Sequence, residues 1–162
     1  MKIGEIIRII VFSLIGLVLM FWIQPLLYEQ RFFGVIRTVP YSEWINQYML
    51  AAGIIFAVSF ISTITWCVML LKNQDGDPNF FKLVWYLGLF VLVVVISITV
   101  YFNNQDPRGE LIQETLISMM ALFFMDSVLI LYWLPTVTST PGLLRKRTVP
   151  GAKLVNGLIN RN

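Results

Sequence analysis

Four long apolar stretches constrain this chain more than any other feature. They cover residues 9–28, 49–71, 83–102 and 115–134, and Asp126 is the one charged residue inside them. A bilayer core of roughly 30 Å needs about 20 helical residues at about 1.5 Å each, and every stretch meets that length. The sequence therefore predicts an all-α, polytopic integral membrane protein.

The expected architecture is an antiparallel bundle of four transmembrane helices within residues 1–135, followed by a basic tail over 136–162. The expected spans are about 7–28, 46–72, 79–103 and 111–134. Charged residues make up 13% of the 162 positions, against about a quarter in soluble proteins. This composition leaves no room for a separate soluble domain. We interpret the first stretch as a retained anchor, because no small-residue cleavage site follows it.

The helix boundaries are marked by aspartate and proline. Asp77 is expected to cap the third span, with Pro78 at its first position, where the missing N–H has no cost. The pair Asp106 and Pro107 repeats this pattern before the fourth span. Pro135 is expected to end the fourth span at Leu134.

The inventory of reactive side chains is small. Cys67 is the single cysteine and the chain has no histidine, so a disulfide, a thiolate metal site and imidazole ligation of zinc or haem have no ligands. We expect no metal, no cofactor and no catalytic centre. Nucleic-acid binding is not expected either, since no folded basic face is predicted.

Charge predicts the orientation. Two basic residues at the N-terminus, two in the second loop and five in the tail give nine on one side, against three on the other. The positive-inside bias then places both termini in the cytoplasm or its topological equivalent. All five tryptophans lie near expected span ends, and we expect them at the headgroup level; they are Trp22, Trp44, Trp66, Trp85 and Trp133.

Two segments outside the spans are candidates for surface contacts. The first loop carries Phe32 and Phe33 beside basic residues, so it is expected to lie on the membrane surface, or else to meet a partner. In the tail, residues 152–161 project as a short amphipathic helix for the cytoplasmic headgroups, with docking onto a partner as the alternative. The basic residues expected at that surface are Arg145, Lys146, Arg147, Lys153 and Arg161.

Asp126 is the position that most needs an explanation. A charge at mid-span costs roughly 2.5 to 3.5 kcal/mol unless it is protonated, paired or hydrated. The leading hypothesis is a protonated Asp126 that donates to a hydroxyl of similar depth, with Ser59, Ser62, Thr63 and Ser13 as candidates. Contact with a partner subunit or lipid, and ion coupling, are the alternatives.

Small residues gather on the second span, with Gly53 and Ala57 at the small-xxx-small spacing, followed by Ser59, Ser62 and Thr63. Such residues let helix backbones approach closely, so this span is the expected centre of packing, against the fourth span or another protein.

The function that these features favour is a non-catalytic accessory, assembly or stabilising subunit of a larger membrane complex. Its expected partners are lipids and other integral membrane subunits, with a hetero-complex favoured over a homo-oligomer. The alternative is a small oligomeric ion- or proton-coupled transporter or channel that uses Asp126. An enzyme is the third hypothesis, because no cluster of reactive side chains is present.

Overall fold

The computed structural model describes residues 3–30, 32, 41–72, 77–105, 113–140 and 148–152. Within these residues the chain is all-helical and contains no strand. The helical elements are α1 (Ile3–Val18), the π-helix η1 (Leu19–Ile23), α2 (Gln24–Glu29), α3 (Tyr41–Lys72), α4 (Pro78–Asn103), α5 (Gln113–Phe124), the π-helix η2 (Met125–Trp133) and α6 (Leu134–Ser139).

These elements combine into four helices that are long and apolar enough to cross a membrane. They are Ile6–Glu29, Trp44–Lys72, Pro78–Asn103 and Leu116–Ser139. The first joins α1, η1 and α2, and the fourth joins α5, η2 and α6. The prediction of an all-helical chain with four helices long and apolar enough to span a membrane is therefore confirmed.

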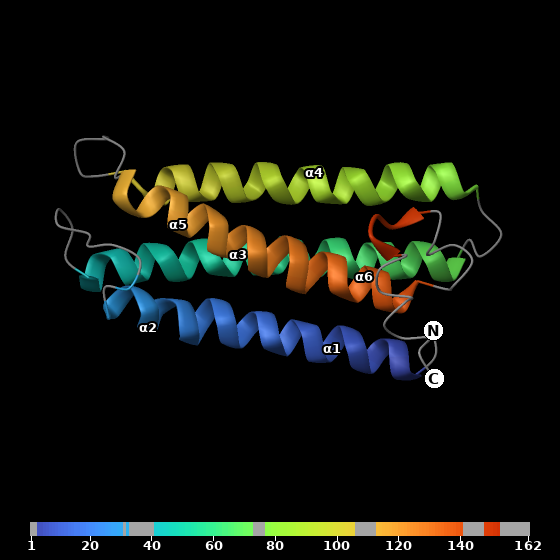
Figure 1. Cartoon of the computed structure of the whole chain (residues 1–162), viewed down its shortest axis with the longest axis horizontal. Coiled ribbons are helices and arrows are strands. Elements are labelled where there is room, and N and C mark those ends of the chain that lie inside the picture. The colour runs from blue at the N-terminus through green and yellow to red at the C-terminus, as the bar shows by residue number, and fades with distance from the viewer. Residues whose placement is uncertain are drawn as a thin grey trace.

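The helices lie side by side along the long axis of the molecule (Figure 1). α1 and α4 occupy opposite sides, with α3 and the α5, η2, α6 helix between them. α3 packs against α1, η1, α4, η2 and α6, and the fourth span likewise contacts all three other helices.

Contacts between named side chains show which helix ends meet. Tyr28 at the end of the first span packs at a tilt against Trp44 at the start of α3, with ring centroids 4.8 Å apart. Arg8 near the start of the first span donates to the Thr138 carbonyl at the end of the fourth, at 2.8 Å. At the other end of α3, Trp66 meets Phe81 of α4 at 6.0 Å.

The cap of α4 is as predicted, whereas the end of the fourth span is not. The Asp77 carboxylate accepts from the backbone N–H of Asn79 at 2.9 Å, and Pro78 begins the helix. The expectation that Pro135 ends the fourth span is wrong, because α6 continues to Ser139. A proline inside a helix removes one N–H and clashes with the preceding turn; here the preceding turns are π-helical, which makes room for the ring.

The same device occurs in the first span. Each π-helix ends two residues before a proline: η1 ends at Ile23 before Pro25, and η2 ends at Trp133 before Pro135. In both, the next backbone N–H bonds five residues back, Gln24 to the Leu19 carbonyl and Leu134 to the Leu129 carbonyl. Proline explains both interruptions.

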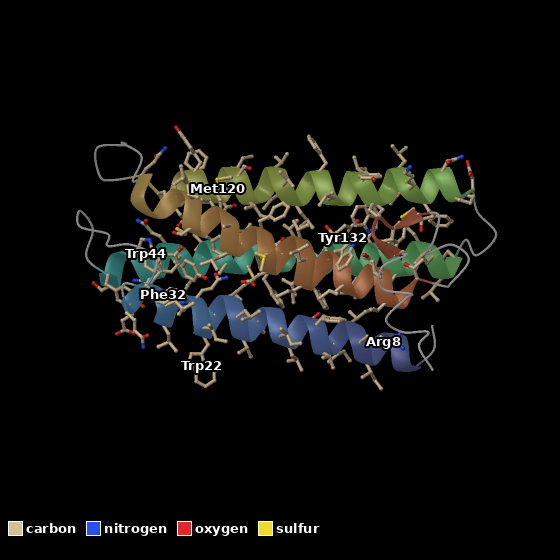
Figure 2. The ribbon with its side chains drawn as sticks, in the orientation of Figure 1. Arg8, Trp22, Phe32, Trp44, Met120 and Tyr132 are labelled. Atoms are coloured by element: carbon tan, nitrogen blue, oxygen red, sulfur yellow. The ribbon has the colours of Figure 1, made fainter. Side chains whose placement is uncertain are left out.

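The tryptophans lie near the span ends as expected, and most of them also pack inside the bundle. Trp22 is 67% exposed and points away from the bundle (Figure 2). Trp44, Trp66 and Trp85 are buried, and Trp133 is half-buried. The area of the buried rings is used in helix packing, and their headgroup depth stays a prediction.

The segment 148–152 folds back against the bundle. Thr148, Val149 and Ala152 are buried, and Trp133 donates its indole N–H to the Pro150 carbonyl at 2.8 Å. Ala152 therefore packs against protein, which differs from the surface position expected of it. The rest of the predicted tail helix, and Arg145, Lys146, Arg147, Lys153 and Arg161, lie outside the described residues.

Candidate functional site

A chain of buried polar groups joins the first, second and fourth spans. Asp126 of η2 is 4% exposed and Gln24 of α2 is 3% exposed. The Gln24 amide nitrogen donates to a carboxylate oxygen of Asp126. The Tyr48 hydroxyl of α3 lies 2.5 Å from the Gln24 amide oxygen and 2.8 Å from the Met20 carbonyl oxygen. Three helices are thus linked at one depth by side chains far apart in the sequence.

The helical register explains why the Met20 carbonyl needs a side-chain partner. At the π-helical spacing of η1, a backbone carbonyl accepts from the N–H five residues later, as the Leu19 carbonyl accepts from the N–H of Gln24. The fifth residue after Met20 is Pro25, which has no N–H. A buried carbonyl without a donor costs about 1 to 3 kcal/mol. The Tyr48 hydroxyl supplies the missing hydrogen bond.

The fourth span has a related contact one layer further along. The Leu131 carbonyl lies four residues before Pro135, so it would lack a partner N–H at α-helical spacing, whereas at the π spacing of η2 the carbonyl that meets Pro135 is that of Ile130. Thr63 of α3 donates its hydroxyl to this carbonyl at 2.6 Å. In each of the two proline-containing spans, a hydroxyl group of α3 therefore donates to a backbone carbonyl near the proline.

Ser59 of α3 has its own partner on the fourth span. Its hydroxyl lies 2.6 Å from the hydroxyl of Ser127 and donates to the Ile55 carbonyl at 2.7 Å. Both serines are buried. This pair adds a second polar link between α3 and η2, beside the Thr63 contact.

The expected partners of Asp126 were wrong. Ser59 bonds Ser127 and Thr63 bonds a backbone carbonyl, while Ser62 and Ser13 are half-buried. The hydrogen bond of Asp126 goes to Gln24. Neighbouring residues on a helix point in different directions, so Ser127 meets α3 while Asp126 meets α2.

An α-helical stripe predicts the surroundings of Asp126 poorly, because the segment is π-helical. Leu129 is 37% exposed although it lies three residues after Asp126, whereas Leu131, five residues after, is 2% exposed. The wider π turn shifts the buried face toward a spacing of five. A proline that follows at a fixed distance is the sequence signal for this shift.

Stacked aromatic rings enclose the site. Tyr48 lies between Phe123 and Trp44, with ring centroids 5.3 and 5.2 Å away. Tyr28 packs on Trp44 and its hydroxyl lies 3.3 Å from that of Ser118 on α5. Rings in this arrangement exclude water from one side of the polar chain, which strengthens its hydrogen bonds.

Gly53 and Ala57 do not make a close helix contact within the described bundle. A Cβ placed on Gly53 would have no atom within 4 Å, and Ala57 is exposed. The close approaches occur at Gly16 and Gly88, where a Cβ would lie 2.7 Å from Leu131 Cγ and 2.9 Å from Tyr132 Cζ. Nothing in the spacing of these two glycines predicts that role.

Another cluster of indole and hydroxyl groups lies where α3 and the fourth span end. Trp66 donates to the Thr140 hydroxyl at 3.2 Å, and Trp85 donates to the Thr136 hydroxyl at 3.0 Å. Tyr132 donates to the Trp85 carbonyl at 2.8 Å. Each of these donors is satisfied inside the bundle, so this end is held by directed contacts as well as by packing.

Of the two phenylalanines that the sequence predicts as surface contacts in the first loop, the structure describes one. Phe32 is 72% exposed, while Phe33 lies outside the described residues. Among the described residues, no three His, Cys, Asp or Glu side chains gather as a metal site would require.

The central chain is therefore a set of hydrogen bonds that ends at one carboxyl group, Asp126, with Gln24 and Tyr48 as neutral donors and acceptors.

Comparison of the sequence with protein-family models, with curated proteins and with solved structures finds no match in any of the three.

Proposed function

We propose that the chain is a non-catalytic accessory, assembly or stabilising subunit of a larger integral membrane complex. The observation that carries this proposal is the outward face of α3 at Gly53 and Ala57, which no described part of the bundle covers. Small residues let two helices approach closely in a bilayer, where dispersion and not hydrophobic burial drives association. This face fits a helix of another subunit.

The internal use of polar side chains supports the same proposal. Asp126, Ser59 and Thr63 each bond within the chain. Such contacts fix helix positions and leave an apolar exterior for neighbours. A scaffold that presents fixed helix faces needs this rigidity.

The proposal includes an antiparallel arrangement of the four spans, with both ends of the chain on the cytoplasmic side. The meeting of Tyr28 with Trp44 and of Arg8 with Thr138 supports the alternating directions. The excess of basic residues on one side supports the orientation.

This orientation is testable by labelling in sealed vesicles. In a Cys67→Ser background, Ser42→Cys at the start of α3 is expected to react only from outside, and Asn79→Cys at the start of α4 only from the cytoplasmic side. Both positions are exposed. Reaction of both cysteines from one side contradicts the topology.

Lipid contacts complete the proposed role. Phe32 projects from the bundle and, with Phe33, would enter the outer headgroup region. The basic tail residues would gain about 1 kcal/mol each near anionic lipid.

Copurification tests the main proposal. After mild detergent extraction, we expect a stoichiometric set of other membrane subunits, and we expect Gly53→Leu with Ala57→Leu to remove them. Val91→Leu with Val94→Leu enlarges an exposed face of α4 and serves as the matched control that keeps them. A homogeneous homo-oligomer, or a complex unchanged by the α3 substitutions, contradicts the proposal.

A proton-coupled transporter or channel is the second candidate, favoured by the buried Asp126 and its hydrogen-bond chain. In reconstituted vesicles this alternative predicts flux that Asp126→Asn abolishes. The accessory role predicts an assembled complex with Asn at the same position.

A further inference from the structure

When Asp126 is ionised, the central polar chain has one donor hydrogen fewer than its buried acceptors need. The Tyr48 hydroxyl lies within hydrogen-bond distance of two acceptors, the Gln24 amide oxygen and the Met20 carbonyl. A hydroxyl carries a single hydrogen. When the Gln24 nitrogen faces Asp126, the single hydrogen of the Tyr48 hydroxyl can go to the Gln24 oxygen or to the Met20 carbonyl. The other of these two buried acceptors is then left without a donor.

Adding a proton to Asp126 removes the shortage. Rotation of the Gln24 amide by half a turn exchanges its nitrogen and oxygen without changing the shape of the side chain. Asp126 O–H then donates to the Gln24 oxygen, the Gln24 nitrogen donates to the Tyr48 oxygen, and Tyr48 donates to the Met20 carbonyl. Three donors meet three acceptors, and the carbonyl that Pro25 leaves open is satisfied.

The charges around Asp126 favour the neutral acid. No Lys or Arg occupies residues 9–28, 49–71, 83–102 or 115–134. From α3 the titratable group beside the Gln24–Asp126 pair is Tyr48, and on α2 Tyr28 packs beside Tyr48 with ring centroids 6.1 Å apart.

The hydrogen bond of Asp126 goes to Gln24, and the other elements packed on η2 carry few charged residues. On α1, Arg8 bonds Thr138 at the far end of the fourth span. On α5, Glu114 lies twelve residues before Asp126 in the sequence, and on α4 the basic group is Lys82 in the first turns. α6 contains no charged residue. A carboxylate at this depth would lack a counter-charge.

We propose that Asp126 binds a proton in the folded protein and that a directed hydrogen-bond chain runs from its carboxyl group through Gln24 and Tyr48 to the Met20 carbonyl. Loss of the proton reverses the Gln24 amide and withdraws Tyr48 from Met20. Because that carbonyl belongs to η1, the proton on the fourth span is coupled to the π-helical turn of the first. This inference stands apart from the accessory role.

Infrared spectroscopy of the full chain in lipid bilayers tests the proposal without a ligand. The chain contains four aspartates, and only Asp126 lies inside an apolar stretch. With carbon-13 in the aspartate side-chain carboxyl groups, we expect an isotope-sensitive carboxylic-acid C=O band at neutral pH. Asp126→Asn should remove this band, and Asp77→Asn, which alters an exposed carboxylate, should leave it.

Two further results decide the proposal even where Asp126→Asn does not fold. The labelled wild-type chain needs no substitution, and an aspartate signal made up wholly of carboxylate bands overturns the bound proton. Gln24→Leu keeps Asp126 but removes its acceptor, so the acid band should shift to the higher frequency of a free C=O and O–H group. An unshifted band in that variant overturns the step through Gln24.

Discussion

The backbone of α4 at Gly88 lies directly against the phenol ring of Tyr132 in η2, since a Cβ on Gly88 would be 2.9 Å from Tyr132 Cζ. The Tyr132 hydroxyl continues past this point to donate to the Trp85 carbonyl. On the opposite side of the fourth span, Gly16 of α1 receives Leu131 in the same way. Two consecutive η2 side chains thus enter notches on two different helices.

The two notches predict a contrast among glycine-to-alanine substitutions. Gly88→Ala and Gly16→Ala should each lower the free energy of unfolding by about 1 to 3 kcal/mol, because the added methyl group overpacks the interface. Gly53→Ala should be neutral or raise it by up to about 1 kcal/mol, because alanine favours the helix and meets no atom. Thermal unfolding in detergent measures the difference, and equal effects at all three positions would contradict the proposed packing.

The Thr63 contact predicts a coupling with Pro135. Thr63→Val keeps the shape but removes the donor to the Leu131 carbonyl, at a cost of about 1 to 3 kcal/mol. In a Pro135→Ala background the turn can return to α-helical spacing, where the N–H of residue 135 reaches that carbonyl, so the same substitution should cost less. A double-mutant cycle on unfolding in detergent should give a coupling of about 1 kcal/mol.

Ser97→Ala is the control for this cycle, because its hydroxyl bonds a carbonyl of its own helix. Strictly additive effects of Thr63→Val and Pro135→Ala would show that the hydroxyl does not replace the missing N–H.

The cluster of indole and hydroxyl groups at the end of the fourth span predicts that substitutions of two α6 threonines differ in their effect on stability. Thr136→Val leaves the Trp85 indole without its acceptor and should destabilise the protein by about 1 to 3 kcal/mol. Thr138→Val should cost less, because the Thr138 hydroxyl bonds only carbonyls of its own helix turn, Leu134 and Pro135. Unfolding followed by tryptophan fluorescence reports both stability and the indole environment, and a larger loss at Thr138 would contradict the assignment.

The segment 148–152 should detach when its glycine is replaced. Gly151 has φ of +76° and a Cβ there would be 3.0 Å from Trp133 Cζ2. An L-residue in this conformation costs roughly 1 to 2 kcal/mol before any contact is counted. We expect Gly151→Ala to speed removal of a C-terminal tag by a protease, whereas Gly4→Ala, with no neighbour within 4 Å, should not. An unchanged cleavage rate would show that Gly151 does not hold the segment.

Local signals in the sequence predicted the parts of the fold that depend on local chemistry. Apolar length gave the four spans, and Asp77 followed by Pro78 gave the start of α4. The Asp126 partner was missed because it depends on where a π turn directs side chains. Gln24 stands beside Pro25, and that pair of residues in an apolar run was the available signal.

The packing of the tryptophans inside the bundle was missed for a different reason. Position near a span end predicts headgroup depth, but it does not say whether the ring faces lipid or another helix. Trp66 and Trp85 donate to Thr140 and Thr136, and hydroxyl groups five residues and one residue after a proline form no sequence pattern that predicts an indole partner. Tertiary contacts decided these positions.

The fourth span is the least apolar of the four helices and has the largest buried share, 39%. During synthesis it reaches the membrane after the first span, which receives Asp126 and Leu131, and after α4, which receives Tyr132. An isolated helix of this composition partitions into lipid less readily than its predecessors. Its retention in the membrane therefore depends on contacts with helices that are already inserted. Substitution of Gly16 or Gly88 would first lower the fraction of chains in which the fourth span inserts.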